Sequence, residues 1–208
     1  GCAYRMRNHK SPGSFSKYQE LLKALRRGGS FGWSPEDTSD RLVIFTERIE
    51  TLRFLAEHLK ADLRLRDDQV ATLYGDGSDK DLQERVEAFG RDREPVRLLI
   101  ASDVASEGLN LHYLCHRMVH FDIPWSLMVF QQRNGRVDRY GQTRAPRIGY
   151  LITEPSHARI RGDLRYLEIL IDKKTKALAV NWDDEIVKAT ALTRDGAVVH
   201  PNFAKTAA

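Results

Sequence analysis

The sequence predicts an α/β domain in which a parallel sheet is covered by helices on both faces. Short runs of β-branched and aromatic residues alternate with longer segments whose apolar residues recur at helical spacing. Strands that alternate with helices are joined by right-handed crossovers, which make the strands parallel and place helices on the two faces. A length of 208 residues and a hydrophobic content of 41% fit one such domain with extensions.

The expected elements follow one another regularly along the chain. The first is an amphipathic helix that starts at Ser16, its expected N-cap, and ends before Gly28. A loop rich in Gly, Ser, Pro and Asp follows at 28–40. Strands are expected at 41–46, 69–75, 96–102, 117–122 and 147–153, with helices between them at 47–62, 79–90 and 126–141. A further helix at 163–180 and a loose tail at 194–208 complete the chain.

These elements divide the chain into three parts. Residues 1–40 form an N-terminal helix and loop, 41–153 carry all five expected strands, and 154–208 form a helical extension with a tail. Only the middle part holds the strand and helix alternation that builds a parallel sheet. We therefore expect the functional residues in 41–153.

Several classes of protein do not fit the composition. No apolar run reaches the roughly 18 residues that a membrane span needs, and no signal-peptide pattern opens the chain, so a cytoplasmic protein is expected. Cys2 and Cys115 are too few for a disulfide framework, and they lie too far apart for a metal motif. His112, His116 and His120 recur at a helical spacing, but their segment runs from a loop into a strand. No metal site is expected.

The positive charge is concentrated in one region. The formal net charge is only +4, from 33 basic and 29 acidic residues, so the total alone does not indicate a polyanion-binding protein. Between 133 and 165, however, eight arginines face only three acidic residues. Nucleic acid is therefore a candidate partner, and the arginines of this region are candidate ligands for phosphate.

Two polar segments follow consecutive strands. Ligands of parallel sheets bind at the carboxyl ends of the strands. The third expected strand is followed by SDVASEGLNL, whose small residues let backbone amides approach a ligand, and the helix after the fourth contains QQRNGRVDRYGQ. In that helix Gln132, Arg136 and Arg139 would share one face. Taken singly, the first is compatible with an ordinary polar loop and the second with a solvated basic face.

Together these segments resemble motifs V and VI of superfamily 2 helicases in their Swi2/Snf2 form, and most closely the bacterial RapA-like branch. The upstream segments RLVIFTER and LYGDGSDKDLQERVEAF resemble motif IV and the strand, turn and helix after it, so the resemblance spans 41–153. It implies a RecA-like three-layer fold that serves as the second motor lobe of an ATP-dependent nucleic-acid translocase or helicase. In such motors ATP and Mg²⁺ lie in the cleft between two lobes.

The resemblance implies a role for each matched residue at the nucleotide. Arg139 is the expected arginine finger, Arg136 the second phosphate arginine, and Gln132 the residue that orients the cluster or touches the nucleotide. Arginine suits this task because its planar, forked and permanently charged guanidinium matches phosphate oxygens. Glu107, Gly108 and Asn110 match motif V positions beside the nucleotide.

A second set of matched residues is implied for nucleic-acid contacts. Ser102 and Asp103 match positions that couple the ATP cleft to the nucleic acid, and four further residues match loops that hold the strand backbone: Thr46, Arg48, Gly75 and Ser78. Such backbone contacts give affinity without reading sequence. The Swi2/Snf2 form favours duplex DNA, while the wider superfamily leaves RNA and strand separation open.

One departure from a complete motor is plain. The chain contains no G-x-x-x-x-G-K-S/T segment and no acidic box, so it lacks the usual lysine and magnesium ligands of a P-loop. The expectation is an excised lobe, inactive alone, whose first lobe precedes Gly1 and holds Mg²⁺. The alternative is a non-catalytic module that binds nucleic acid or a partner such as RNA polymerase.

Several aromatic and arginine side chains carry expectations of their own. Trp125 is expected to pack under the sixth motif, with base stacking as the alternative, while Phe31 and Trp33 lie in the expected loop and could contact a partner. Arg136 and Arg139 are expected to be exposed and unpartnered, or neutralised by a carboxylate or anion. The remaining arginines of the stretch, Arg133, Arg144 and Arg147, are expected to serve solvent, packing or nucleic acid.

Overall fold

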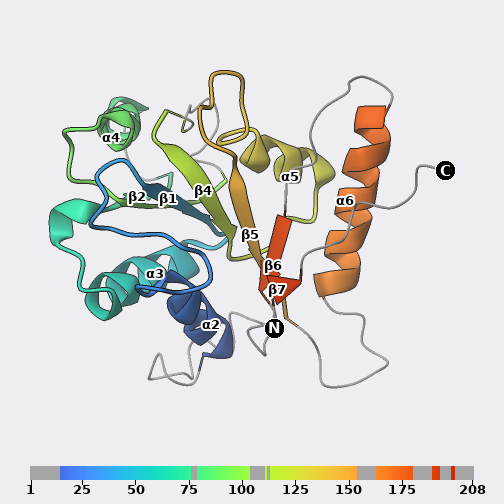
Figure 1. The fold of residues 1–208 in the computed structure, drawn as a ribbon, viewed down its shortest axis with the longest axis horizontal. Coiled ribbons are helices and arrows are strands. Elements are labelled where there is room, and N and C mark those ends of the chain that lie inside the picture. The colour runs from blue at the N-terminus through green and yellow to red at the C-terminus, as the bar shows by residue number, and fades with distance from the viewer. Residues whose placement is uncertain are drawn as a thin grey trace.

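A seven-stranded sheet forms the centre of the molecule (Figure 1). The computed structural model describes residues 15–75, 79–103, 111, 113–153, 163–179, 189–192 and 198–199. Within them the strand order is β2-β3-β1-β4-β5-β6-β7. The strands are β1 (Arg41–Phe45), β2 (Val70–Leu73), β3 (Leu98–Ala101), β4 (Cys115–His120), β5 (Arg147–Leu151), β6 (Ala189–Leu192) and β7 (Val198–Val199). The first six are parallel and β7 is antiparallel to β6.

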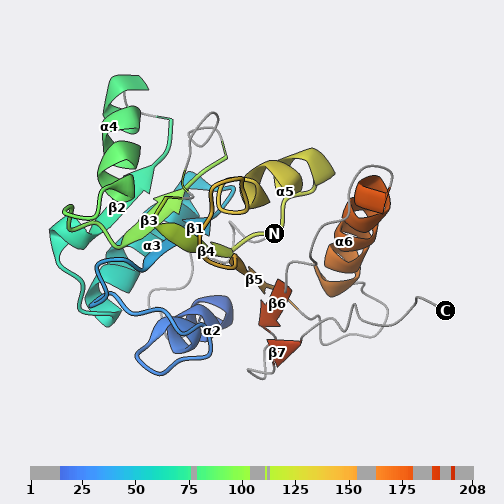
Figure 2. The same ribbon diagram turned by 45° about the horizontal axis from the view of Figure 1, so that its top comes forward.

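Helices cover both faces of the sheet, as the alternation in the sequence predicted. They are α2 (Ser16–Leu25), α3 (Ile49–Asp62), α4 (Asp79–Gly90), α5 (Leu127–Asn134) and α6 (Asp163–Ala179). Figure 2 shows α4 and α5 on one side of the strands and α2 on the other. The side chains of α2 and α3 share one buried cluster, and those of α4, α5 and α6 share another. The predicted three-layer α/β fold is confirmed.

Strand β1 shows why residues 42–45 form a continuous apolar run in the sequence. All five of its residues are buried. Val43 and Phe45 belong to the cluster under α4, α5 and α6, whereas Leu42 and Ile44 belong to the cluster under α2 and α3. Residues 42–45 are apolar because side chains on both faces of the strand are kept from water, whereas the buried Arg41 at its start donates to the carbonyls of Arg91 and Glu94. β1 thus lies inside the sheet, between β3 and β4.

The helix after β4 is shorter than the sequence predicted. It ends at Asn134, whereas the pattern extended it to 141. Gly135 is its C-cap, and the N–H of Arg136 donates to the carbonyl of Arg133 three residues back, which tightens the last turn. A glycine disfavours the helix interior because it loses the most backbone freedom there. Arg136 and Arg139 therefore lie in a turn beyond the helix, and the prediction that they share a helix face with Gln132 is wrong.

Two further expectations about element ends are corrected. Ser16 is the first helical residue and not an N-cap, because Phe15 occupies the cap position and no side chain caps the helix. The expected loose tail contains β7, and β6 precedes it. β6 is only four residues long, and it gains its strand partners from β5 and β7, which a reading of local sequence does not reveal. None of the helices in the described part of the chain is long and apolar enough to cross a membrane.

Candidate functional site

Polar residues follow three neighbouring strands at one edge of the sheet. β3, β1 and β4 lie side by side. Their carboxyl ends lead into residues 102–103, 46–47 and 121–122, which bring Asp103, Glu47 and Asp122 to the same edge. This is the edge at which parallel sheets bind ligands. We refer to it below as the carboxyl edge.

Arg133 of α5 is the centre of the carboxyl edge. Its Nε and Nη2 atoms donate to the two carboxylate oxygens of Asp103 at 2.5 and 2.7 Å, and its Nη1 atom donates to the carbonyl of Asp122 at 2.8 Å. The guanidinium also lies 5.6 Å from the centroid of the Phe45 ring. Because the residue is only 2% exposed, this forked contact ties the loop after β3 firmly to α5. Of the three roles expected for Arg133, packing is the one found.

The Asp122 carboxylate is held by the hydroxyl of Thr46 and by the ammonium group of Lys17. Its Oδ2 atom accepts a hydrogen bond from the hydroxyl of Thr46 at 2.5 Å, and Lys17 of α2 lies 3.8 Å from its Oδ1 atom. Lys17 also lies 4.0 Å from Asp163, the first residue of α6. Thr46 is fully buried. Its hydroxyl thus positions Asp122 in this arrangement and does not face a ligand, so a nucleic-acid contact by this side chain stays a prediction.

Glu47 is the most exposed carboxylate of the carboxyl edge. Partial burial raises the pKa of Glu47 above its ordinary value, and the nearby negative charges of Asp122 and Asp103 raise it further, while Arg133 opposes the shift. Arg133 bonds to the carboxylate of Asp103 and to the backbone carbonyl of Asp122, whereas the Asp122 carboxylate lies near Lys17. The carboxyl edge is therefore fixed by charge pairing around Arg133, and its outer carboxylate takes up a proton more readily than a free glutamate.

A buried polar network lies directly behind Arg133. His120 Nε2 is 2.8 Å from Asn134 Oδ1, and Arg133 Nη1 is 3.4 Å from His120 Nδ1. Asn134 Nδ2 also donates to the hydroxyl of Tyr150 at 3.4 Å. Burial and, to a smaller extent, the nearby Arg133 charge lower the pKa of His120 to about 3. A neutral imidazole that donates from Nε2 and accepts at Nδ1 satisfies both neighbours, so the network fixes the tautomer of His120.

The arginine loop, defined here as residues 135–141, projects from the end of α5. Arg139 and Tyr140 are exposed and Arg136 is half-buried. Arg136 and Arg139 each interact with another residue, so the expected arrangement without partners is not found. Backbone bonds to Asn134 from Val137 and Asp138 hold the start of the loop against the helix. The loop is thus ordered, and it presents Arg139 to solvent.

The other matched residues are distributed unevenly. Gln132, Arg48 and Gly75 are exposed, and Asp103 is half-buried in its pair with Arg133. Ser102 is buried, with its N–H bonded to the carbonyl of Leu73 on β2. Four matched residues lie outside the described residues: Ser78, Glu107, Gly108 and Asn110. The nucleotide assignments of the last three therefore remain predictions.

Trp125 does not pack under the sixth motif, and that expectation is wrong. Its side chain is 79% exposed. It contacts the ring of Tyr166 on α6 at a centroid distance of 4.7 Å, and the Tyr166 hydroxyl donates to the Trp125 carbonyl. Met128, one turn further on, is 62% exposed. The start of α5 therefore presents apolar side chains to solvent, which keeps base stacking available to Trp125.

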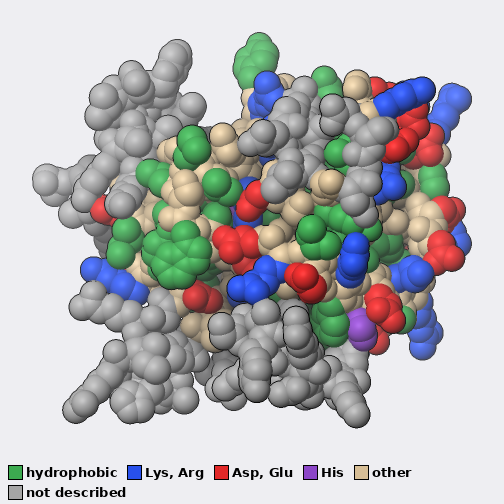
Figure 3. All heavy atoms as spheres, turned by 180° about the vertical axis from the view of Figure 1, so that it is seen from behind, with side chains coloured by type: hydrophobic (Ala, Val, Ile, Leu, Met, Phe, Trp, Pro, Cys, Tyr) green, Lys and Arg blue, Asp and Glu red, His purple; other side chains and the backbone are tan. Residues whose placement is uncertain are grey.

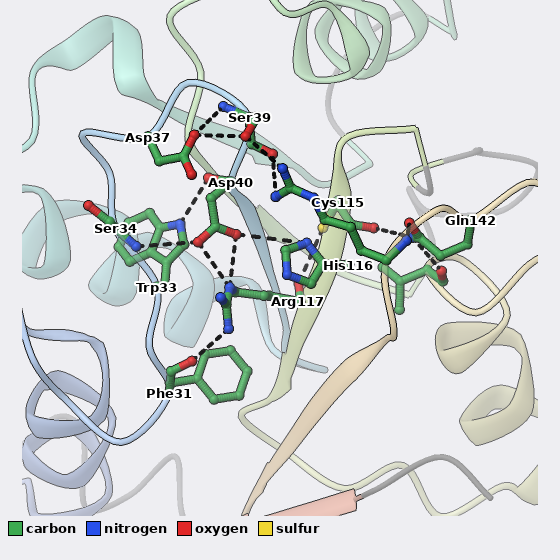
Figure 4. A network of polar contacts seen from close by, with 12 residues as sticks. Phe31, Trp33, Ser34, Asp37, Ser39, Asp40, Cys115, His116, Arg117 and Gln142 are labelled. Atoms are coloured by element: carbon green, nitrogen blue, oxygen red, sulfur yellow. Dashed lines mark hydrogen bonds and ion pairs between the residues drawn. The ribbon is translucent and has the colours of Figure 1, made fainter. Parts of the chain in front are cut away.

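The loop at 28–40 folds onto the opposite, amino edge of the sheet (Figure 4). The guanidinium Nε of Arg117 on β4 donates to both carboxylate oxygens of Asp40 at 2.8 and 3.0 Å, and its Nη1 donates to the carbonyl of Phe31. Phe31 and Trp33 are 1% and 2% exposed. These aromatic side chains belong to the core under α2 and α3, so they are not available to a partner.

Two arginines of the basic region fix the same loop. Arg144 donates to the carbonyl and hydroxyl of Ser39, and Arg147 donates to the carbonyl of Ser30 at 2.6 Å. Arg147 also lies 5.4 Å from the centroid of the Phe31 ring. Both therefore serve packing, one of the roles expected for them. On the face seen from behind (Figure 3), acidic and basic side chains are interspersed among hydrophobic ones, without one dominant sign.

The histidines and the cysteine of β4 are structural. Cys115 is fully buried, and burial raises the pKa of its thiol to about 12. Burial lowers the pKa of His116, which lies 3.8 Å from Asp40. Among the described residues, no group of three or more His, Cys, Asp or Glu could hold a metal ion. These side chains therefore contribute packing and hydrogen bonds to β4.

A parallel sheet between two layers of helices, with a polar carboxyl edge and an arginine loop beyond β4 and α5, is the architecture of a RecA-like helicase lobe. The model of the helicase conserved C-terminal domain matches residues 16–141, and the chain belongs to this family. The chain is 35% identical over 99 residues to a probable ATP-dependent RNA helicase, DDX43, from Homo sapiens. This match covers 48% of the chain and 14% of that protein. The chain is also 32% identical over 110 residues to the RNA polymerase-associated protein RapA of Vibrio campbellii. That match covers 52% of the chain and 11% of RapA.

Solved structures agree on the fold. The C-terminal part of the Fun30 ATPase domain matches with a TM-score of 0.52 and 21% identity, over 77% of this chain and 54% of that one. The E. coli DEAD-box protein SrmB, in its complex with regulator of ribonuclease activity A, matches with a TM-score of 0.51 and 22% identity, over 84% and 82%. The superfamily 2 resemblance, including its RapA-like branch, is confirmed. The chain spans less than a third of the length of the curated relatives it matches here.

Proposed function

We propose that this chain is the second motor lobe of an intracellular, ATP-dependent nucleic-acid translocase. The observation that carries the proposal is the arginine loop, which presents Arg139 to solvent while Arg133 fixes the helix before it to the loop after β3. A helicase C-terminal domain contributes one wall of a cleft, and the other wall would come from a first lobe in the same protein. ATP supplies the phosphoryl group that is transferred to water in that cleft.

The residues of this lobe suit the phosphate end of such a cleft. Arg139 is the finger that would reach the γ-phosphate, Arg136 the second phosphate arginine, and Gln132 the polar side chain beside them. Phosphoryl transfer depends mainly on positioning and charge stabilisation, and a finger arginine contributes about 10³ to 10⁵ in rate in well-studied NTPases. We assign Mg²⁺ to the first lobe, because the usual lysine and magnesium ligands belong to the P-loop and the acidic box, which this sequence lacks. Glu107, Gly108 and Asn110 would line the nucleotide.

The nucleic acid would lie against the carboxyl edge. Arg48 is exposed beside that edge, and Trp125 offers an exposed ring for stacking. Asp103 would sense the nucleic acid through its loop and pass the change to α5 through Arg133. Ser102, Gly75, Ser78 and the backbone at Thr46 would complete the contacts with the strand. Duplex DNA is the proposed track because of the Swi2/Snf2-type relatives, and RNA polymerase is a candidate assembly partner because of RapA's name.

The proposal is tested by ATP turnover of the full-length protein, measured with and without duplex DNA and duplex RNA. We expect turnover that DNA stimulates and that Arg139→Ala abolishes. Arg144→Ala is the matched control, because it removes the same charge from a side chain that bonds to Ser39. A non-catalytic binding module predicts the reverse pattern: no turnover in the parent protein, and weaker nucleic-acid binding in the Arg144→Ala variant than in the Arg139→Ala variant.

A further inference from the structure

Gln142 fixes the far end of the arginine loop through its side-chain amide. Its Nε2 atom donates to the carbonyl of Val137 and to the carbonyl of Cys115, each at 3.0 Å. Its Oε1 atom accepts from the N–H of Arg144 at 3.2 Å. The amide therefore uses both of its donor hydrogens and one acceptor position. Figure 4 shows Gln142 beside Cys115, at the amino end of β4.

The backbone of Gln142 binds Arg139, the proposed arginine finger. Its N–H donates to the carbonyl of Arg139 at 3.0 Å and closes a turn over residues 139–142. Gly141, inside this turn, has a φ of 93°, which L side chains rarely adopt. The side chain of Gln142 thus binds the loop at Val137, just before the exposed segment 138–140, and its main chain binds Arg139 within that segment.

The amino end of β4, to which Gln142 is bonded, is itself held in place by several contacts. Cys115 is the first residue of β4 and is fully buried. Two residues on, the guanidinium of Arg117 donates two hydrogen bonds to the carboxylate of Asp40. The amino end of β4 is therefore tied to the core and to the loop at 28–40. A loop bonded to this point cannot shift without breaking contacts at the base of the sheet.

We propose that Gln142 is a positioning residue that sets where the Arg139 guanidinium lies during ATP hydrolysis. This inference rests on the proposed function. A displacement of about 1 Å in a positioning element can lower a rate by about 100-fold. Because Gln142 contacts only carbonyls and an amide of the chain, its loss should lower kcat and leave the KM for ATP nearly unchanged.

The variants Gln142→Leu and Gln142→Glu test the role in the full-length protein. The leucine loses all three hydrogen bonds, and the ionised glutamate turns acceptor oxygens toward the carbonyls of Val137 and Cys115. We expect kcat to fall by about 10- to 100-fold in both at pH 8. Because the ordinary pKa of a glutamate is about 4.3, the side chain stays ionised from pH 6 to 8, and the deficits of both variants should stay constant over that range.

Gln83→Leu is the matched control, since Gln83 is exposed on α4 and bonds only to Glu87 among the contacts found. Amide hydrogen exchange of residues 135–142 is measured alongside turnover, because it reports the loop independently of ATP. We expect exchange about tenfold faster in Gln142→Leu and unchanged in Gln83→Leu. If Arg139→Ala abolishes turnover but both Gln142 variants keep parental kcat and exchange, the positioning role is overturned and the proposed function stands. If Arg139→Ala leaves turnover unchanged, both are overturned.

Discussion

Arg133 and Asp103 form a two-pronged ion pair that joins the helix after β4 to the loop after β3. The guanidinium is buried while the carboxylate is about one-third exposed, with side-chain exposures of 1% and 32%. The pair links the two segments that resemble helicase motifs V and VI. It supplies a physical connection between the proposed nucleotide and nucleic-acid contacts of the lobe.

Removing one partner of this pair should destabilise the lobe. Asp103→Ala leaves the buried Arg133 guanidinium without its carboxylate, and breaking a buried pair in this way costs about 3 kcal/mol or more. The free energy of unfolding, measured by urea titration of the 208-residue chain, provides the test. Glu168→Ala is the control, because Glu168 pairs with Arg165 in an exposed contact worth less than about 1 kcal/mol. Equal losses in the two variants would contradict the assignment.

The buried imidazole of His120 should make stability depend on pH. Its folded-state pKa of about 3 lies below the ordinary value of 6.5, so the unfolded chain takes up the proton first. Stability is therefore complete above pH 6.5 and falls as the pH drops toward 3. Between pH 7.5 and 5.5 the contribution of His120 should fall by about 1.4 kcal/mol.

The variant His120→Gln isolates this contribution, since it keeps a donor toward Asn134 but does not titrate. Other groups, including His116, shift stability in parent and variant alike. We therefore compare the change in unfolding free energy from pH 7.5 to 5.5 in the two proteins. Identical changes would show that His120 is not held neutral by its surroundings.

Gly149 on β5 is a place where even one methyl group does not fit. A Cβ there would lie 3.0 Å from Cε2 of the Phe31 ring, which is buried against Arg147. Gly149→Ala should therefore lower the free energy of unfolding by about 1 to 3 kcal/mol.

At Gly90, the last residue of α4, an added Cβ would meet nothing within 4 Å. Gly90→Ala should raise stability by about 0.4 to 1 kcal/mol. Thermal unfolding of both variants checks the opposite signs.

Trp125 should matter for binding and little for folding. Its ring touches Tyr166 but is largely exposed, so Trp125→Ala should change the free energy of unfolding by no more than about 1 kcal/mol. Loss of a stacked base should weaken nucleic-acid binding by about 1 to 3 kcal/mol. Tyr113, 67% exposed before β4 at the amino edge, is the control. Equal affinities of the Trp125→Ala and Tyr113→Ala variants, measured by fluorescence anisotropy with labelled duplexes, would rule out the stacking role.

The sequence predicted the fold better than the details of the site. Strands such as β1 are recognisable because burial on both faces favours a continuous apolar run, here residues 42–45. The end of α5 was misjudged, because an arginine spacing of three is compatible with a helix and with the turn that Gly135 starts. β6 escaped notice because its pairing with β5 is a long-range contact.

The burial of the three arginines also could not be predicted from the local sequence pattern. Arg133, Arg136 and Arg139 look equivalent in the sequence, yet the first is buried, the second half-buried and the third exposed. Arg133 is held by the carboxylate of Asp103, which is thirty residues away in the sequence, and a local pattern does not reveal that contact. Gln142 ends the segment that resembles motif VI, but its contacts depend on Val137 and Cys115, which the fold brings to its amide.

The central claim, that Arg139 acts at the γ-phosphate, is tested most directly by nucleotide affinity. The full-length protein, Arg139→Ala and Arg144→Ala are compared for binding of ADP alone and of ADP with aluminium fluoride, a mimic of the transferred phosphoryl group. We expect all three to bind ADP equally, and the preference for the mimic to fall at least tenfold in Arg139→Ala only. An unchanged preference in Arg139→Ala would contradict the claim.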